Sequence, residues 1–317
     1  MAYFWMISGF LLAAYSIVGN DALQILGPFL SSNEKKPWWV LWLFTSTILI
    51  GILTYGWFIH QGDISYGRLS AFPLPDPLNG IYVIPPLALL FLTSFGIPVS
   101  TTFLILTVFE PGNLTEMLTK SLLGYGLAFV VAMGLYQVIS QLLEKTFIES
   151  ADKPIATYWS FLQWGATAFL WSQWLIQDLA NIFVYLPRQL SLVWLVFSLG
   201  MMLALQAMIF YQHGGEIEKI VTSKTNTQDI RSATLINFIY GFILLFFQQY
   251  SQMPMSTTWV FIGLLAGREV AIAFNLQIRS LRETGNLIFK DISKASLGLG
   301  VSVLLAFALP WFSQQIH

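Results

Sequence analysis

Two short polar motifs that adjoin long apolar segments contain the side chains most suited to binding a cation. The motifs at 19–24 and 177–181 each combine one aspartate with two amide side chains that lie four residues apart and share a helical face. Carboxylate and amide oxygens suit a hard cation such as Na⁺. The alternative is that both carboxylates only cap or pack helices near the membrane interface. The predicted sodium ligands are Asn20, Asp21, Gln24, Gln177, Asp178 and Asn181.

A second motif, P-x-S-T-T, also occurs twice, at 98–102 (the first break) and at 254–258 (the second break). Each break interrupts an apolar stretch, and the residues after it can begin a half-helix whose first N–H groups are free. Such a terminus carries a positive dipole and binds oxyanions without a basic side chain. The alternative is that these hydroxyls simply cap a helix start. The predicted anion ligands are Ser100, Thr101, Thr102, Ser256, Thr257 and Thr258.

The composition indicates that these motifs belong to a membrane protein. Of 317 residues, 56% are hydrophobic and only 10% are charged, and the mean hydropathy is +0.67. Soluble domains carry about 25% charged residues, so a soluble protein is excluded. The net charge of −1 gives no basic field for nucleic acid, and the absence of cysteine excludes thiolate chemistry.

The apolar segments define the elements that must position the motifs. A spanning helix needs about 20 mostly apolar residues. Six segments satisfy this requirement, at 2–19, 37–60, 118–143, 157–177, 190–212 and 295–315. Two more, at 81–109 and 233–276, contain the breaks and predict helical hairpins that enter the membrane and return. The first segment has no basic region before it and is expected to be a retained span, and 61–80 is expected to be a surface connection.

The two halves of the chain repeat each other. Asp21 and Asp178 lie 157 residues apart, and Pro98 and Pro254 lie 156 apart. Each half holds three spans and one broken hairpin, and the hairpin returns to the side from which it enters. Each half therefore crosses the membrane three times, and this odd number should give the two halves inverted topology. We therefore predict an all-α polytopic membrane protein made of inverted repeats at 1–150 and 151–317. Inverted repeats with broken helices indicate a secondary transporter whose site lies near the membrane midplane, between the repeats.

The distribution of lysine and arginine predicts the orientation. Twelve fall on the side opposite the N-terminus: Lys35, Lys36, Lys145, Lys153, Lys219, Lys224, Arg231, Arg268, Arg279, Arg282, Lys290 and Lys294. Only three fall on the N-terminal side: Arg68, Lys120 and Arg188. The side rich in positive charge is expected to be cytoplasmic. Both termini should then face outside the plasma (inner) membrane.

One further charged pair, Arg268-Glu269, follows the second break and has no counterpart in the first half. The simpler prediction is an ion pair that fixes the hairpin to the rest of the protein. The alternative is a gate at the cytoplasmic mouth of the transport pathway.

At these motifs the chain resembles the inorganic phosphate transporter (PiT) family of Na⁺- or H⁺-coupled symporters, which carries two G-A-N-D-V-A-N-like and two P-V-S-T-T-H-like motifs in inverted repeats. The resemblance implies that the six polar residues of the Asp motifs line sodium and anion sites, that the six hydroxyls hold the anion, and that the protein forms a homodimer. We expect no enzymatic activity and no cofactor other than the coupling ion. Phe103 and Trp259 stand where the family often has histidine, and Gln24 and Gln177 replace asparagines.

These features predict a Na⁺-coupled symporter of a small inorganic oxyanion, with phosphate first and sulfate or bicarbonate as alternatives. A proton is the alternative coupling ion. An anion channel with the same half-helices is a second class. An intramembrane hydrolase that uses Ser100 or Ser256 is a third, but neither hairpin contains a histidine to act as its base.

Overall fold

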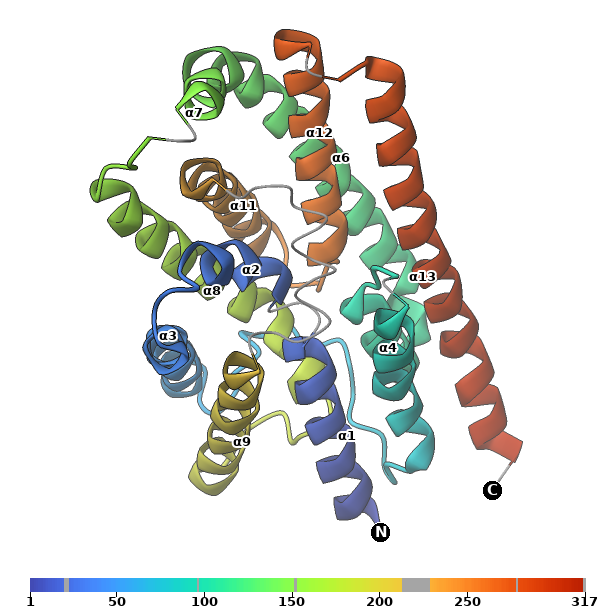
Figure 1. The fold of residues 1–317 in the computed structure, drawn as a ribbon. Helices are drawn as coiled ribbons and strands as arrows, with labels where there is room; N and C mark the ends of the chain where they lie inside the picture. The colour runs from blue at the N-terminus through green and yellow to red at the C-terminus, as the bar shows by residue number, and fades with distance from the viewer. Residues whose placement is uncertain (20–22, 96, 151–152, 213–228, 278, 316–317) are drawn as a thin grey trace.

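The computed structural model describes residues 1–317 except for 20–22, 96, 151–152, 213–228, 278 and 316–317 (Figure 1). The described residues form helices and turns, with no strand among them. The predicted all-helical fold is therefore confirmed for this part of the chain. Asn20 and Asp21 lie outside the described residues, and of Gln24 only the backbone is described.

Six helices in the described part of the chain are long and apolar enough to cross a membrane. This finding confirms the class of multi-pass membrane protein. They are α3 (Trp38–Ile59), α6 (Leu114–Ile139, within the longer helical stretch Pro111–Glu149), α9 (Leu192–Tyr211), α11 (Ile230–Tyr250), α12 (Thr257–Leu276) and α13 (Leu281–Gln315).

The remaining helices are shorter or more polar. They are α1 (Ala2–Ile17), α2 (Leu23–Ser32), α4 (Ile84–Ser94), α5 (Thr107–Phe109), α7 (Lys145–Glu149) and α8 (Tyr158–Phe183), with 3₁₀ turns η2 (Gly80–Val83) and η4 (Pro111–Asn113) and π-helical turns η3 (Thr102–Leu106) and η5 (Ser140–Glu144). The two predicted hairpins differ. Around the second break, α11 and α12 are each long enough to span, whereas α4 before the first break has 11 residues.

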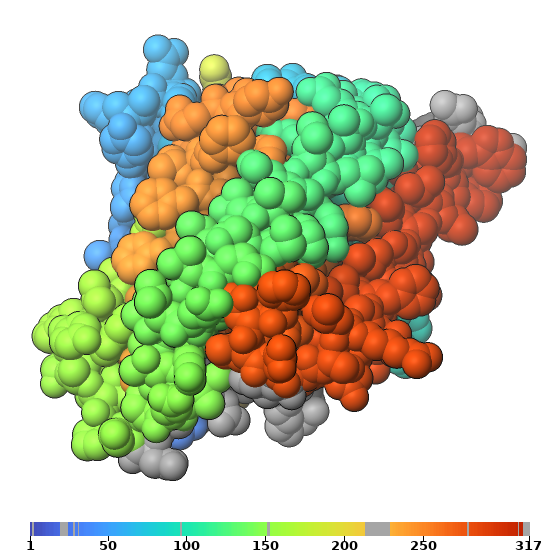
Figure 2. Space-filling view, turned by 90° about the horizontal axis from the view of Figure 1, so that it is seen from above, coloured from blue at the N-terminus to red at the C-terminus, as the bar shows by residue number. Residues whose placement is uncertain are grey.

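The helices pack in pairs around α8. The largest contacts join α12 to α6 and α11 to α8, and α3 packs against α9. The start of α1 and the end of α13 lie at the same end of the bundle, while α7 and the end of α12 lie at the other (Figure 1). Figure 2 shows α6 in green and α13 in red, both exposed on the face seen there.

The second half of α8 is buried on every side. Every residue from Trp174 to Phe183 is buried, although a helix at the surface of a bundle would expose one face. This helix is therefore central, and it places Asp178 in the interior of the protein.

The connection at 61–80 is irregular, as the sequence predicts, but part of it is buried rather than at the surface. The apolar side chains of Ile64, Leu69 and Phe72 are buried in the core. The carboxylate of Asp63 accepts hydrogen bonds from the backbone N–H groups of Ser65 and Gly67, both at 2.7 Å, and so organises the turn. The sequence does not predict this partial burial, because these apolar residues are too few and too irregularly spaced to indicate packing.

Glycine allows α12 to approach α6 closely. A Cβ atom on Gly267 would overlap the backbone carbonyl oxygen of Phe129 in α6, and a Cβ on Gly263 would overlap that of Tyr125. Backbone atoms move aside less easily than flexible side chains, so a larger residue at either position should destabilise the packing of α12 against α6.

We expect Gly267→Ala to destabilise the protein by about 1–3 kcal/mol, the usual cost of overpacking. The matched control is Gly134→Ala in α6, because no atom lies within 4 Å of a Cβ built there. Thermal unfolding in detergent should show a lower midpoint for Gly267→Ala and an unchanged or higher midpoint for Gly134→Ala. Equal midpoints for the two variants would contradict the close packing.

Candidate ion-binding site

The two breaks meet in the interior and exchange equivalent hydrogen bonds. The hydroxyl of Thr102 donates to the carbonyl oxygen of Met255 at 3.2 Å, and the hydroxyl of Thr258 donates to that of Val99 at 3.4 Å. In each case the last threonine of one break binds the second residue of the other. The same pairing in both directions joins two segments that are more than 150 residues apart in the chain.

Asn181 and Asp178 of α8 complete this cluster. The Nδ2 atom of Asn181 donates to Asp178 Oδ1 at 2.8 Å and to the hydroxyl oxygens of Thr101 and Thr102, both at 3.1 Å. The Thr102 hydroxyl lies 3.5 Å from Asp178 Oδ1, and the Thr257 side chain lies beside the same carboxylate. All five residues are buried. The structure thus brings one predicted cation motif together with both predicted anion motifs.

Two buried oxygens in this cluster lack a donor. No described residue donates a hydrogen bond to Asp178 Oδ2 or Asn181 Oδ1, and the same holds for the neighbouring Gln177 Oε1. A buried polar atom without a partner costs about 1–3 kcal/mol, and more when it is charged. A small cation bound to the oxygens of Asp178 and Asn181 would remove that cost. The donor set consists of carboxylate, amide and hydroxyl oxygens, which suits Na⁺.

Gln177 points in a different direction from its two partners in the motif. Its Nε2 atom donates to the carbonyl oxygen of Leu244 in α11 at 3.0 Å. The structure therefore places Gln177 between α8 and α11 rather than against the threonines of the breaks.

The serine of each break caps a helix. Ser100 Oγ accepts from the backbone N–H of Phe103, and Ser256 Oγ accepts from that of Trp259, both at 3.2 Å. Ser256 is the N-cap of α12. Phe103 and Trp259 are both buried and pack in the core. Helix formation thus begins at the residue after the serine of each break. Thr257 occupies the first turn of α12, beside Asp178.

Three residues outside the predicted motifs hold the second break in place. The Nζ atom of Lys120 in α6 donates to the carbonyl oxygen of Ser251 at 2.9 Å and to that of Met253. Ser121 Oγ accepts from the N–H of Ser256 at 2.9 Å, and the Tyr240 hydroxyl donates to the carbonyl oxygen of Thr257 at 2.9 Å. One signal was available for Lys120, because it is the only charged residue in the apolar segment 118–143.

Arg268 links α12 to the end of the α6 stretch. Its guanidinium lies 2.7 Å from Glu269 and 3.3 Å from the buried carboxylate of Glu144. Glu144 also accepts a hydrogen bond from Ser232 at 2.6 Å. Arg268 therefore lies in a network that ties α12, η5 and α11 together.

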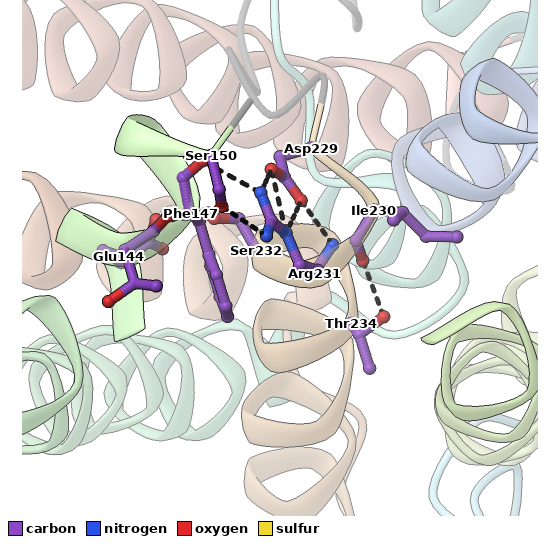
Figure 3. A network of polar contacts seen from close by, with 9 residues as sticks. Glu144, Phe147, Ser150, Asp229, Ile230, Arg231, Ser232 and Thr234 are labelled. Carbon is purple, nitrogen blue, oxygen red and sulfur yellow. Dashed lines mark hydrogen bonds and ion pairs between the residues drawn. The ribbon is translucent and has the colours of Figure 1, made fainter. Parts of the chain in front are cut away.

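A neighbouring network anchors the start of α11 (Figure 3). Arg231 pairs with Asp229 at 2.6 Å, donates to the Ser150 hydroxyl at 2.8 Å and to the Phe147 carbonyl oxygen at 2.9 Å, and lies over the Phe147 ring. Figure 3 shows Ser232 and Glu144 beside these residues. The two networks join α7, α11 and α12 at one end of the bundle.

Comparison with models of protein families, with curated proteins and with solved structures found no match to this chain.

We expect Glu144→Ala to destabilise the protein by about 3 kcal/mol, because it leaves the buried Arg268 with only the partly exposed Glu269 as partner. The control is Glu149→Ala, which removes an exposed pair with Lys145 at 4.0 Å and should cost less than 1 kcal/mol. Thermal unfolding in detergent measures both. A stable Glu144→Ala variant that leaks ions would instead favour the gate.

Proposed function

We propose that this protein is a Na⁺-coupled secondary symporter of a small inorganic oxyanion, with phosphate as the first substrate to test. One observation carries the proposal. Asp178 and Asn181 from α8 meet the hydroxyls of both breaks in one buried polar cluster, inside an all-helical membrane fold. Polar side chains at such depth are costly, so they indicate a functional site.

The cation half of the proposal rests on charge and on unpaired oxygens. Asp178 is fully buried, and its carboxylate has no ion-pair partner within 4.0 Å among the described residues. Sodium would neutralise this carboxylate and use its free Oδ2 atom together with Asn181 Oδ1. Asp21, at the equivalent place in the first motif, would supply a second carboxylate.

The anion half rests on the start of α12. Helix N-termini attract anions through free N–H groups and the helix dipole. Thr257 and Thr258 carry hydroxyl groups in the same first turn, and Thr258 would exchange its hydrogen bond to the Val99 carbonyl oxygen for one to the anion. Bound Na⁺ would offset the repulsion between an oxyanion and Asp178, and this dependence is the physical basis of coupling.

The reciprocal hydrogen bonds between the breaks support inverted repeats at 1–150 and 151–317. A site shared by two such repeats can open alternately to each side when one repeat moves against the other. An inward Na⁺ gradient would drive uptake, and each charge that moves down 100 mV contributes about 2.3 kcal/mol. The external position of both termini in the plasma (inner) membrane and the homodimer remain part of this proposal.

Uptake of phosphate into proteoliposomes tests the proposal. We expect saturable uptake that needs an inward Na⁺ gradient, with unlabelled sulfate and bicarbonate as weak competitors. Strong competition by sulfate or bicarbonate would identify that anion, rather than phosphate, as the substrate. Equal uptake under a proton gradient would identify H⁺ as the coupling ion. Fast, non-saturating flux without Na⁺ would identify a channel.

We expect Asp178→Asn to reduce Na⁺-dependent uptake at least about 100-fold, because the neutral amide cannot balance the charge of Na⁺. The isosteric change should leave thermal stability without Na⁺ close to that of the wild type. Asp291→Asn on the exposed face of α13 is the control and should transport normally. Full sodium coupling in Asp178→Asn would rule out this site.

A further inference from the structure

Arg68 is a buried cation with no hydrogen-bond or ion-pair partner among the described residues. The side chain is 1% exposed, and its Nε, Nη1 and Nη2 atoms donate to no acceptor in the part of the chain that the structure describes. No carboxylate among the described residues lies within ion-pair distance of it. A buried guanidinium that is neither paired nor hydrogen-bonded costs several kcal/mol, so an anionic partner is expected in the working protein.

The half-buried Arg188 and the buried Arg231 and Arg268 do have partners. Arg188, which lies in the connection after α8, donates to the carbonyl oxygens of Phe72, Val184 and Leu186 at 2.7–3.0 Å. Arg231 and Arg268 are paired with carboxylates. The lack of partners is thus particular to Arg68, and it is not a general feature of arginine in this fold.

The position of Arg68 relates it to the candidate site. Its guanidinium lies within electrostatic range of the carboxylate of Asp178 and of the ammonium group of Lys120. Lys120 holds the carbonyl oxygens of Ser251 and Met253, directly before the second break. Glu116, one turn before Lys120, also interacts with that lysine, but its side chain is exposed and water screens it.

Arg68 remains charged in this environment. Burial lowers the pKa of Arg68 to about 10, while the nearby Asp178 carboxylate opposes the change. At neutral pH the guanidinium therefore keeps its proton. Among the described residues, Arg68 thus lies within electrostatic range of one buried carboxylate, Asp178, and of one buried ammonium group, Lys120.

We propose that Arg68 is a ligand for the transported oxyanion, which it binds between the 61–80 connection and the start of α12. The planar guanidinium presents donors in a fork that matches two oxygens of an oxyanion, and such charge-assisted bonds are the strong ones. The assignment rests on the proposed function for the identity of the anion as substrate. It adds a basic ligand to a site that the polar motifs alone would build from hydroxyls and N–H groups.

The test is the thermal stability of the detergent-solubilised full chain with and without inorganic phosphate, with sulfate and bicarbonate in parallel. We expect phosphate to raise the unfolding midpoint of the wild type and to leave that of Arg68→Gln unchanged. Without any anion, Arg68→Gln should be as stable as the wild type or more stable, since an unpaired buried charge is removed. The increase in the unfolding midpoint that Na⁺ causes should persist in Arg68→Gln. In proteoliposomes the KM for the anion should rise at least about tenfold.

Arg68→Lys and Arg188→Lys serve as matched variants. Arg68→Lys keeps the charge but loses the fork, so it should restore part of the anion response. Arg188→Lys loses hydrogen bonds to carbonyl oxygens, so it should lower the midpoint without anion while the shift caused by phosphate remains.

Three results would overturn the assignment. They are an undiminished shift in Arg68→Gln, no shift of the wild type with any of the three anions, and a lower midpoint of Arg68→Gln without anion together with loss of the Na⁺ shift. The last would make Arg68 a structural partner of Asp178.

Failure of the proposed function is separate from failure of the Arg68 assignment. An anion shift that depends on Arg68 without Na⁺-driven uptake would retain the binding site and reject symport, whereas normal uptake by Arg68→Gln would reject only the role of Arg68.

Discussion

The burial of the Asp178 carboxylate is the constraint on which the rest of the structure depends. An ionised carboxylate inside a membrane protein needs hydrogen bonds and a compensating charge. Asn181 and Thr102 supply hydrogen-bonding groups to one carboxylate oxygen, and the other oxygen accepts from no described residue. Thr102 of the first break and Thr257 of the second can reach Asp178 because each apolar segment is interrupted just before them. The breaks are therefore the means by which polar groups reach a carboxylate in the middle of the bundle.

Broken helices expose backbone groups, and the fold satisfies many of them from other elements. Thr102 and Thr258 bind carbonyl oxygens of the opposite break, Lys120 binds two carbonyl oxygens before the second break, and Ser121 accepts from Ser256. The glycines of α12 bring its backbone against α6, and the pair of Arg268 with Glu144 ties the same two elements together at one end. These contacts surround the polar centre, and under the proposed function a bound Na⁺ would supply the charge that the described residues do not.

Much of this arrangement was predictable from the sequence, and particular residues show why the rest was not. The apolar spans indicated the helices, and the repeated Ser-Thr-Thr motif indicated helix starts. For the two serines, which were predicted as anion ligands, the structure contains the helix caps that were the alternative. The spacing of Gln177 and Asn181 placed them on one face, yet Gln177 turns to Leu244 of α11, because local periodicity does not specify which neighbour a helix face meets. Arg68 lay in a segment without periodicity, so its burial depends on long-range packing. Its only signal was its place among the three cations on the N-terminal side.

The central claim is that Na⁺ and an oxyanion share one site at the meeting point of the breaks. Calorimetric titration of phosphate into the detergent-solubilised wild type, in sodium and in choline buffers of equal ionic strength, tests this claim most directly. Ligands that stabilise each other in one site show reciprocal coupling, typically 5- to 150-fold in affinity. We predict that Na⁺ tightens phosphate binding at least about fivefold, and that phosphate tightens Na⁺ binding by the same factor. Phosphate that binds with equal affinity in both buffers would contradict the account.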